Sequence, residues 1–214
     1  MTDLIEKLNH ELFNIDLNLT EKTKIKLINF ILLMDKWNKT YNLTSIRNVD
    51  QMVNKHLIDS LVVSKYLKGG NYIDVGTGPG LPGIPLALAN PDKTFFLMDS
   101  QTKRINFIKQ VKRELDIKNI HPILGRCENF DKSQYNNISF DGILSRAFAS
   151  LEDMLRLCEN ICSDNTLFFA LKGQLDEEEL ASVNGQYKII KTIRLEVPKD
   201  LGDRHLIIVG KNNG

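Results

Sequence analysis

The chain has 214 residues, the size of one domain or of one domain with a short extension. Its net charge of +1 excludes the global electrostatic field that marks many nucleic-acid binders, so any basic surface must be local. No apolar run approaches the roughly 20 residues of a membrane helix. The start of the sequence carries acidic residues where a signal peptide has an apolar segment. We therefore expect a cytoplasmic protein with no membrane partner.

The three cysteines, Cys127, Cys158 and Cys162, are an odd number and have no histidine close by in the sequence. This pattern favours reduced thiols over disulfides or a zinc site, so we expect no metal.

The first part of the chain, residues 1–67, has helical periodicity. Thr20 is a good N-cap for a helix that runs to about Trp37. A further helix is expected over roughly residues 53–67, and Gly69-Gly70 then marks a boundary. We predict an N-terminal helical extension over residues 1–67 and a second unit over residues 68–214.

After this boundary, short apolar runs alternate with helical segments, of which residues 103–115 have the strongest periodicity. This alternation predicts a mostly parallel sheet in an α/β fold. The last two strands are too close together for a helix, so we expect them to be antiparallel. The seven predicted strands are residues 71–75, 94–98, 120–124, 140–145, 166–171, 187–195 and 205–210.

The most informative segment is the glycine-rich turn after the first predicted strand. Gly76, Gly78 and Gly80 alternate there, and a helical segment and a second strand that ends in Asp99 follow. Glycines let the backbone approach a ligand where a Cβ would clash, and an acid at the end of the second strand can accept both hydroxyl groups of a ribose. The segment predicts a site for an adenosine-containing cofactor.

Two other interpretations compete with this one. The turn can be a tight turn without a ligand, and Gly78 to Gly83 also satisfies the fingerprint of dinucleotide-binding domains. Against a dinucleotide, Pro79 and Pro82 remove amide donors that would face a pyrophosphate. Asp74 is a charged group in a core strand, which is costly unless it has a partner. Its carboxylate can accept from the amino group of a methionine moiety or from backbone amides of the loop.

With its antiparallel final hairpin, the chain resembles the class I methyltransferases that use S-adenosylmethionine over residues 71–210. The resemblance implies a seven-stranded, mostly parallel sheet and S-adenosylmethionine as the cofactor. No cysteine follows a proline, and the fourth strand does not end in an Asp/Asn-Pro-Pro-aromatic motif. These absences exclude the usual enzymes for cytosine carbon-five and for exocyclic amino groups. They favour an acceptor with a free lone pair, such as the position-seven nitrogen of guanine, and we assign no catalytic acid or base.

Six segments in order resemble the small-subunit ribosomal RNA guanine methyltransferases of the glucose-inhibited-division-protein-B family. They are KWNKTYNLTSI, HLIDSL, IDVGTGPGLPGIPL, LMDSQTKRINFIKQV, LSRAFASL and ALKGQ. The resemblance implies methylation of a guanosine in 16S ribosomal RNA, as free RNA or in the small subunit. It places cofactor-binding residues at Gly76, Leu81, Cys127, Glu128 and Arg146. Two alternatives remain: a methyltransferase for a small molecule or a protein, and a nucleotide-binding module without chemistry.

The region between Gln101 and Arg126 contains seven basic and two acidic residues. It is either an RNA phosphate patch or a solvated helix face. The residues that we assign to RNA on this basis, or because they end a central strand, are Lys103, Arg104, Lys109, Lys112, Arg146 and Lys172.

We give structural interpretations to two further pairs of polar residues. His56 and Asp59 lie three residues apart in a helical segment, which favours a cap or a salt link. Arg204 and His205 begin the last strand, where either can be simply solvated.

Overall fold

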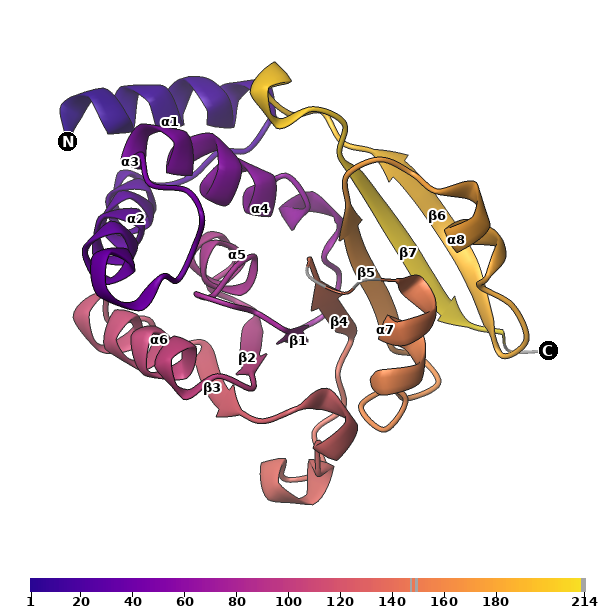
Figure 1. Cartoon of the computed structure of the whole chain (residues 1–214). Helices are drawn as coiled ribbons and strands as arrows, with labels where there is room; N and C mark the ends of the chain where they lie inside the picture. The colour runs from indigo at the N-terminus through magenta and orange to yellow at the C-terminus, as the bar shows by residue number, and fades with distance from the viewer. Residues whose placement is uncertain (147, 149, 213–214) are drawn as a thin grey trace.

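A computed structural model describes residues 1–146, 148 and 150–212 of the chain. Its centre is a seven-stranded sheet with the order β3-β2-β1-β4-β5-β7-β6 (Figure 1). All neighbouring strands are parallel except β7, which is antiparallel to both β5 and β6. The predicted fold class is confirmed. The strands are β1 (Asn71–Val75), β2 (Thr94–Asp99), β3 (Ile120–Leu124), β4 (Gly142–Ser145), β5 (Leu167–Lys172), β6 (Tyr187–Arg194) and β7 (His205–Lys211).

Helices cover both faces of the sheet (Figure 1). The N-terminal helices pack with α5 and α6 against one face, and α7 packs against the other. Along β1, Tyr72 belongs to the first core and Ile73 to the second, as the alternation of a strand buried on both faces requires. The helices are α1 (Thr2–Asn14), α2 (Glu21–Tyr41), α3 (Val49–Met52), α4 (Asp59–Leu61), α5 (Gly83–Ala89), α6 (Thr102–Glu114), α7 (Leu151–Leu157) and α8 (Glu177–Ala181).

The helix α2 begins after Thr20, as the sequence predicts, but it continues four residues beyond the predicted end at Trp37. The Thr20 hydroxyl accepts a hydrogen bond from the Thr23 amide at 3.2 Å, and the helix ends at Asn42, which has a left-handed φ of 49°. The helix expected over residues 53–67 is different. It begins four residues earlier as α3, continues as a π-helix over Val53–Ile58, and ends with α4 and a 3₁₀ turn over Ser64–Tyr66.

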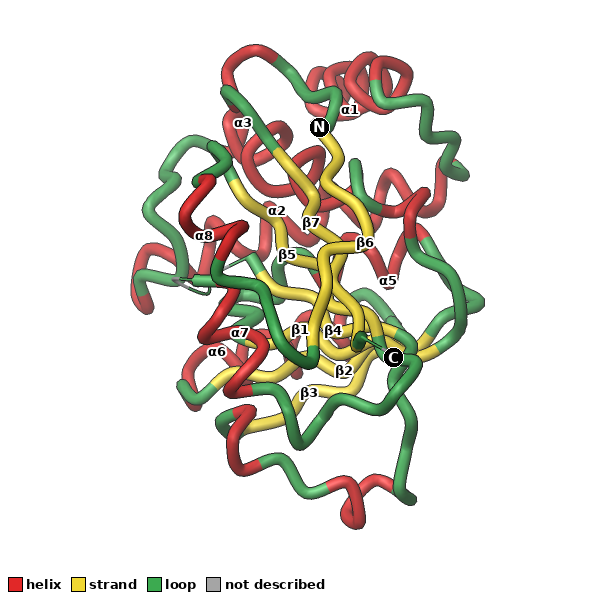
Figure 2. The backbone as a smooth tube through the Cα atoms, turned by 90° about the vertical axis from the view of Figure 1, so that its right-hand side faces the viewer, coloured by secondary structure: helices red, strands yellow, loops and turns green. Residues whose placement is uncertain are grey.

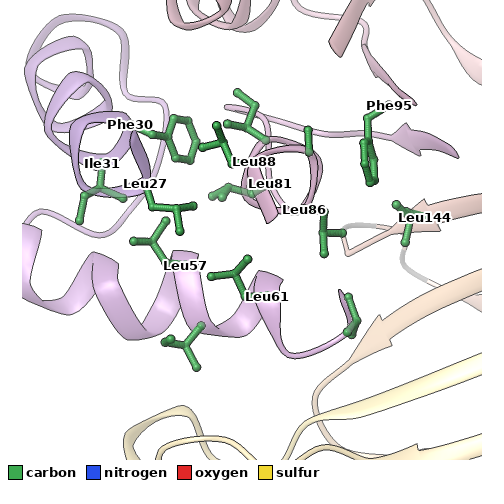
Figure 3. Packing of buried hydrophobic residues seen from close by; sticks show 14 of the residues in the cluster. Leu27, Phe30, Ile31, Leu57, Leu61, Leu81, Leu86, Leu88, Phe95 and Leu144 are labelled. Atoms are coloured by element: carbon green, nitrogen blue, oxygen red, sulfur yellow. The ribbon is translucent and has the colours of Figure 1, made fainter. Parts of the chain in front are cut away.

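The N-terminal segment and the sheet share one hydrophobic core. Figure 3 shows Leu27 and Phe30 of α2 and Leu57 of the π-helix beside Leu81 and Leu86, which lie between them and the sheet. The division into residues 1–67 and 68–214 stays a prediction, because this core crosses it.

The sheet has a topological switch point between β1 and β4. From β1 the chain order runs outward to β2 and β3, and from β4 it runs in the opposite direction to β5. Figure 2 looks at the molecule from the β6–β7 end of this twisted sheet. Open α/β sheets bind ligands outside the carboxyl ends of their strands at such a point, so this edge is where a site is expected.

Candidate functional site: two cavities at the carboxyl edge

The glycine-rich loop after β1 has the backbone that its sequence predicts. Gly76, Gly78 and Gly80 have φ values of 71°, 60° and 97°, in the region that side chains rarely adopt. A Cβ at Gly80 would also lie 2.3 Å from the Ile84 side chain. The amides of Gly76 and Thr77 both donate to the Met98 carbonyl at 3.0 Å, which fixes the start of the loop to β2.

Asp99 connects this loop to the start of α6. Its Oδ2 accepts from the Gly78 amide and from Nη1 of Arg104, both at 3.0 Å, and its Oδ1 accepts from the Gln101 amide at 2.9 Å. Only 3 % of the residue is exposed, and it lies on the wall of a cleft. The acid at the end of β2 therefore orders the loop as well as facing the cleft.

Asp74 is a residue of β1 directly before the loop, and it is fully buried. Its Oδ2 accepts from the Thr77 hydroxyl at 2.6 Å and from the Gly83 amide at 2.9 Å. Of the two roles predicted for Asp74, the structure thus shows the one toward loop amides. Burial raises the pKa of this carboxyl to about 6, although both hydrogen bonds lower it. Its Oδ1 has no hydrogen-bond partner among the described residues.

The first cavity is a cleft of about 300 Å³ over the ends of β1, β2 and β3. This volume is at the lower end of the range for small-molecule sites. The predicted residues Gly76, Asp99, Cys127 and Glu128 all line it. Arg104, which the sequence assigned to RNA, also lines it, and the sequence did not indicate the other lining residues, which include Met98, Ser100, Gly125, Phe148 and Leu157.

The lining of this cleft suits an adenosyl cofactor. Gly78 has open space beside it, since a Cβ there would meet no atom within 4 Å. The carboxylate of Asp99 is a ribose acceptor, and Met98, Phe148 and Leu157 form an apolar and aromatic wall for an adenine. The residues present therefore fit S-adenosylmethionine.

Besides Arg146, which is described below, four predicted cofactor residues do not line this cleft, and Gly78 is one of them. Leu81 is buried in the core with the N-terminal helices, so its side chain does not reach the cleft (Figure 3). Gly80 and Asp74 do not line the cleft either. Gly80 shapes the turn of the loop, and Asp74 in β1 accepts hydrogen bonds from the loop. A short glycine motif cannot separate residues that touch the ligand from residues that shape the loop.

The second cavity, of about 480 Å³, lies over the ends of β4 and β5. Arg146, which follows β4, and Lys172, the last residue of β5, both line it. Arg146 was predicted for both the cofactor and the RNA, and its role toward the cofactor stays a prediction. Of the described residues that follow β4, Arg146 lines the second cavity and Phe148 the first. Ala147 and Ala149 of the LSRAFASL motif lie outside the described residues.

A buried carboxylate organises the wall of the second cavity. Oδ2 of Asp59 accepts from Nη1 of Arg146 at 3.1 Å, and Oδ1 accepts from Nε of Arg204 at 2.6 Å. The Asp59 side chain is 9 % exposed. The salt link expected for Asp59 is present, but its partners are two arginines far away in the sequence and not His56.

His56 lies beside this ion-pair group and is also buried. Its Nε2 is 3.0 Å from the Thr44 hydroxyl, and its Nδ1 is 3.0 Å from the Lys55 carbonyl oxygen. Burial and, less strongly, the charge of Arg146 lower the pKa of His56 to about 4. The imidazole is therefore neutral at pH 7.

The basic residues assigned to RNA on α6 have different surroundings. Lys109 and Lys103 are exposed, and the Lys103 ammonium donates to the Tyr41 carbonyl at 3.1 Å. The Lys112 ammonium donates to the Ile120 carbonyl at 2.6 Å. Arg104 faces the first cleft and pairs with Asp99, so it belongs with the cofactor side of the molecule and not with the helix surface.

The comparison with known protein families is decisive. The sequence model described as GidB, rRNA small subunit methyltransferase G, matches residues 23–207. The chain belongs to this family. It is 54 % identical to the ribosomal RNA small subunit methyltransferase G of Haemophilus ducreyi, over 96 % of this chain and 99 % of that protein. It is 50 % identical to the protein of the same name from Glaesserella parasuis, over 97 % of this chain and all of that protein.

Solved structures of low sequence identity show the same fold. M. capricolum TrmK in complex with S-adenosyl-homocysteine has a TM-score of 0.56 at 18 % identity, covering 72 % of this chain and 67 % of that chain. The mitomycin 7-O-methyltransferase MmcR has a TM-score of 0.62 at 10 % identity, covering 76 % and 56 %.

These findings confirm the predicted family, the assignment as a methyltransferase and S-adenosylmethionine as the cofactor. A small-molecule or protein methyltransferase and a module without chemistry are not favoured. In the described part of the chain, no group of side chains has the arrangement of a metal site. No helix within residues 1–146 or 150–212 is long and apolar enough to span a membrane.

Proposed function

We propose that this protein transfers a methyl group from S-adenosylmethionine to the position-seven nitrogen of a guanosine in 16S ribosomal RNA. The first cavity holds the cofactor, and the second receives the target nucleotide. When bound, S-adenosylmethionine supplies a methyl group on a positively charged sulfur. Family membership supports ribosomal RNA as the substrate. The choice of nitrogen rests on the chemistry of the second cavity.

One observation carries this choice: neither of the two buried side chains of the second cavity, Asp59 and His56, is placed to act as a base. Asp59 has one oxygen in contact with each of two guanidinium groups, so both oxygens are already engaged. His56 has a pKa of about 4 and both ring nitrogens near polar partners. An acceptor that must lose a proton before attack has no suitable partner in these two groups. The ring nitrogen at position seven of guanine has a free lone pair and needs none.

The protein then contributes position and charge. Gly76 and Asp99 define the cofactor cleft, and Arg146 and Lys172 supply positive charge to the neighbouring cavity. Phe148 lines the first cavity and Arg146 the second, so these two residues mark where donor and acceptor must meet. Holding two reactants in line accounts for a large share of the rate in such transfers.

The test is methyl transfer from labelled S-adenosylmethionine to 16S RNA and to small ribosomal subunits. RNA with 7-deazaguanine at the target must accept no methyl group, because the attacking nitrogen is absent. The rate must also lack the steep rise with pH that a titrating protein base produces. Transfer to the 7-deaza substrate would refute the chosen nitrogen, and transfer to free guanosine alone would favour a small-molecule substrate.

A further inference from the structure

Three neighbouring strands bring cationic side chains to one edge of the sheet. The strands β4 and β5 end there, and β7 begins there because it is antiparallel. Arg146 follows β4, Lys172 ends β5, and Arg204 immediately precedes β7, where His205 is paired with Lys172. The antiparallel insertion of β7 thus brings Arg204 into the same cavity as the ends of the parallel strands.

Two guanidinium groups repel one another, and Asp59 keeps them together. Each of its oxygens accepts from a different arginine, at 3.1 Å from Nη1 of Arg146 and 2.6 Å from Nε of Arg204. Each arginine is held a second time by a backbone carbonyl, of Lys55 for Arg146 and of Asp203 for Arg204. The group of three keeps a net charge of +1 because one carboxylate faces two cations.

Both arginines keep donors for a ligand. The side chains are 26 % and 30 % exposed, and both line the second cavity. Among the described residues, no hydrogen bond involves Nη2 of either guanidinium. A guanidinium matches the geometry of a phosphate, and charge-assisted hydrogen bonds of this kind are the strong ones.

Asp59 reaches this cavity through an irregular helix. The π-helix Val53–Ile58 directly precedes it, and the Asp59 amide donates to the Asn54 carbonyl with the wide spacing of such a helix. A π-helix adds a residue to the turn and is often found at functional sites. Both His56, within this π-helix, and Asp59, directly after it, line the cavity.

A role in stability alone explains the ion pairs of Asp59 with Arg146 and Arg204 less well. A buried ion pair is a weak source of stability, because both charges lose their hydration. This one lies on the wall of an open cavity at the ligand-binding edge of the sheet, and RNA is a polyanion whose phosphates are bound by arginine. We propose that Arg146 and Arg204 together bind a backbone phosphate beside the target guanosine, and that Asp59 is the positioning residue that holds both guanidinium groups in place. This inference rests on the proposed function.

The first test is Arg204→Gln, with binding of unmethylated 16S RNA measured over a range of salt concentrations. Affinity should fall about tenfold at low salt. The slope of log K against log salt should become shallower by about one, as expected for one lost phosphate contact. Arg204→Lys keeps the charge and should restore the slope but not the full affinity. The matched control is Arg194→Gln on β6, an exposed arginine that also pairs with an aspartate.

The second test separates positioning from charge. Asp59→Asn keeps the shape and raises the local charge by one, so electrostatics alone would strengthen RNA binding. If Asp59 positions the arginines, affinity for RNA should instead fall about tenfold, and turnover should fall on the order of a hundredfold. The unfolding temperature should fall, because the two guanidinium groups lose their shared partner. Calorimetric affinity for S-adenosylmethionine should stay near that of the wild type, which shows that the variant is folded.

These binding experiments distinguish failure of this inference from failure of the proposed function. If the wild type methylates RNA but Arg204→Gln binds RNA with unchanged affinity and salt slope, the phosphate site is refuted and the function stands. Tighter RNA binding by Asp59→Asn would refute the positioning role. A wild type that transfers no methyl group to any RNA refutes the proposed function, while the salt slopes still decide whether the arginines bind phosphate.

Discussion

Asp99 combines two tasks that a motif cannot separate. Its carboxylate faces the cofactor cleft and also holds the Gly78 amide and the Arg104 guanidinium. We expect Asp99→Ala to weaken S-adenosylmethionine binding by about 2 kcal/mol or more, since a charge-assisted acceptor is lost and the loop loses an anchor. Calorimetric titration measures this. Asp92→Ala, at an exposed aspartate before β2, is the control and should bind as the wild type does.

Gly78 allows a test with an unusually close control. Gly78 and Gly185 have φ values of 60° and 66°, and a Cβ at either would meet no atom within 4 Å. Alanine at either position should therefore cost a similar backbone strain, about 1–2 kcal/mol. Gly78→Ala should in addition weaken binding of S-adenosylmethionine, whereas Gly185→Ala should not. Equal cofactor affinity in the two variants would remove Gly78 from the site.

The sequence indicated those site residues whose role depends on local geometry. Gly76, Cys127 and Glu128 were predicted at the cofactor cleft and do line it. The pairing of Asp59 with Arg204 was not predictable, because 145 residues separate them and the local pattern around Asp59 pointed to His56. Only the antiparallel placement of β7 brings the two together.

The helix α6 is the element with the strongest local charge. Lys103 and Lys109 are its exposed cations from the predicted RNA group. Replacing both by glutamine should weaken RNA binding and reduce the salt slope by about two, with little change in cofactor affinity. Lys188 and Lys191 on the edge strand β6 form a matched control pair of exposed lysines. If the two double variants have the same salt slope, the α6 lysines are only a solvated helix face.

At the level of elements, hydrophobic periodicity located all seven strands to within about two residues. Hydrophobic periodicity did not predict two features of the structure. The position of β7 between β5 and β6 depends on which edge remains open after the parallel strands have paired. The π-helix Val53–Ile58 has an ordinary helical sequence, and its wide turn becomes defined only where His56 and Asp59 meet the cavity.

The N-terminal segment is part of the functional site of the whole molecule. It shares the core of the sheet, and it supplies Thr44, Lys55, His56 and Asp59 to the wall of the second cavity. The cofactor cleft, in contrast, is built from residues 75–157. In the proposed function, one common fold becomes specific in this way: the sheet supplies the donor site, and the added helices shape the acceptor site.

Burial of His56 couples the stability of the whole molecule to pH. Its pKa is about 4 in the folded protein and about 6.5 in the unfolded chain, so the unfolded state takes up a proton first as the pH falls. Its contribution is fully present above pH 6.5 and is lost progressively between pH 6.5 and pH 4, to a total of about 3 kcal/mol. Asp74 has a raised pKa, about 6, and therefore changes stability in the opposite direction, with stability lost as the pH rises from about 4 to 6.

A comparison of variants isolates the histidine from these other groups. The free energy of unfolding, measured with urea at pH 8 and pH 5, should fall less between the two values in His56→Gln than in the wild type. The difference should be about 2 kcal/mol, because the shift in pKa is only partly expressed at pH 5. His10→Gln is the control, since the side chain of His10 is 72 % exposed. The charged groups around His56 are Lys55, Asp59 and Arg146, and they are unchanged in both variants. If His56→Gln and the wild type lose equal stability on acidification, the imidazole is not held neutral by burial, and it would again be a candidate base for the acceptor cavity.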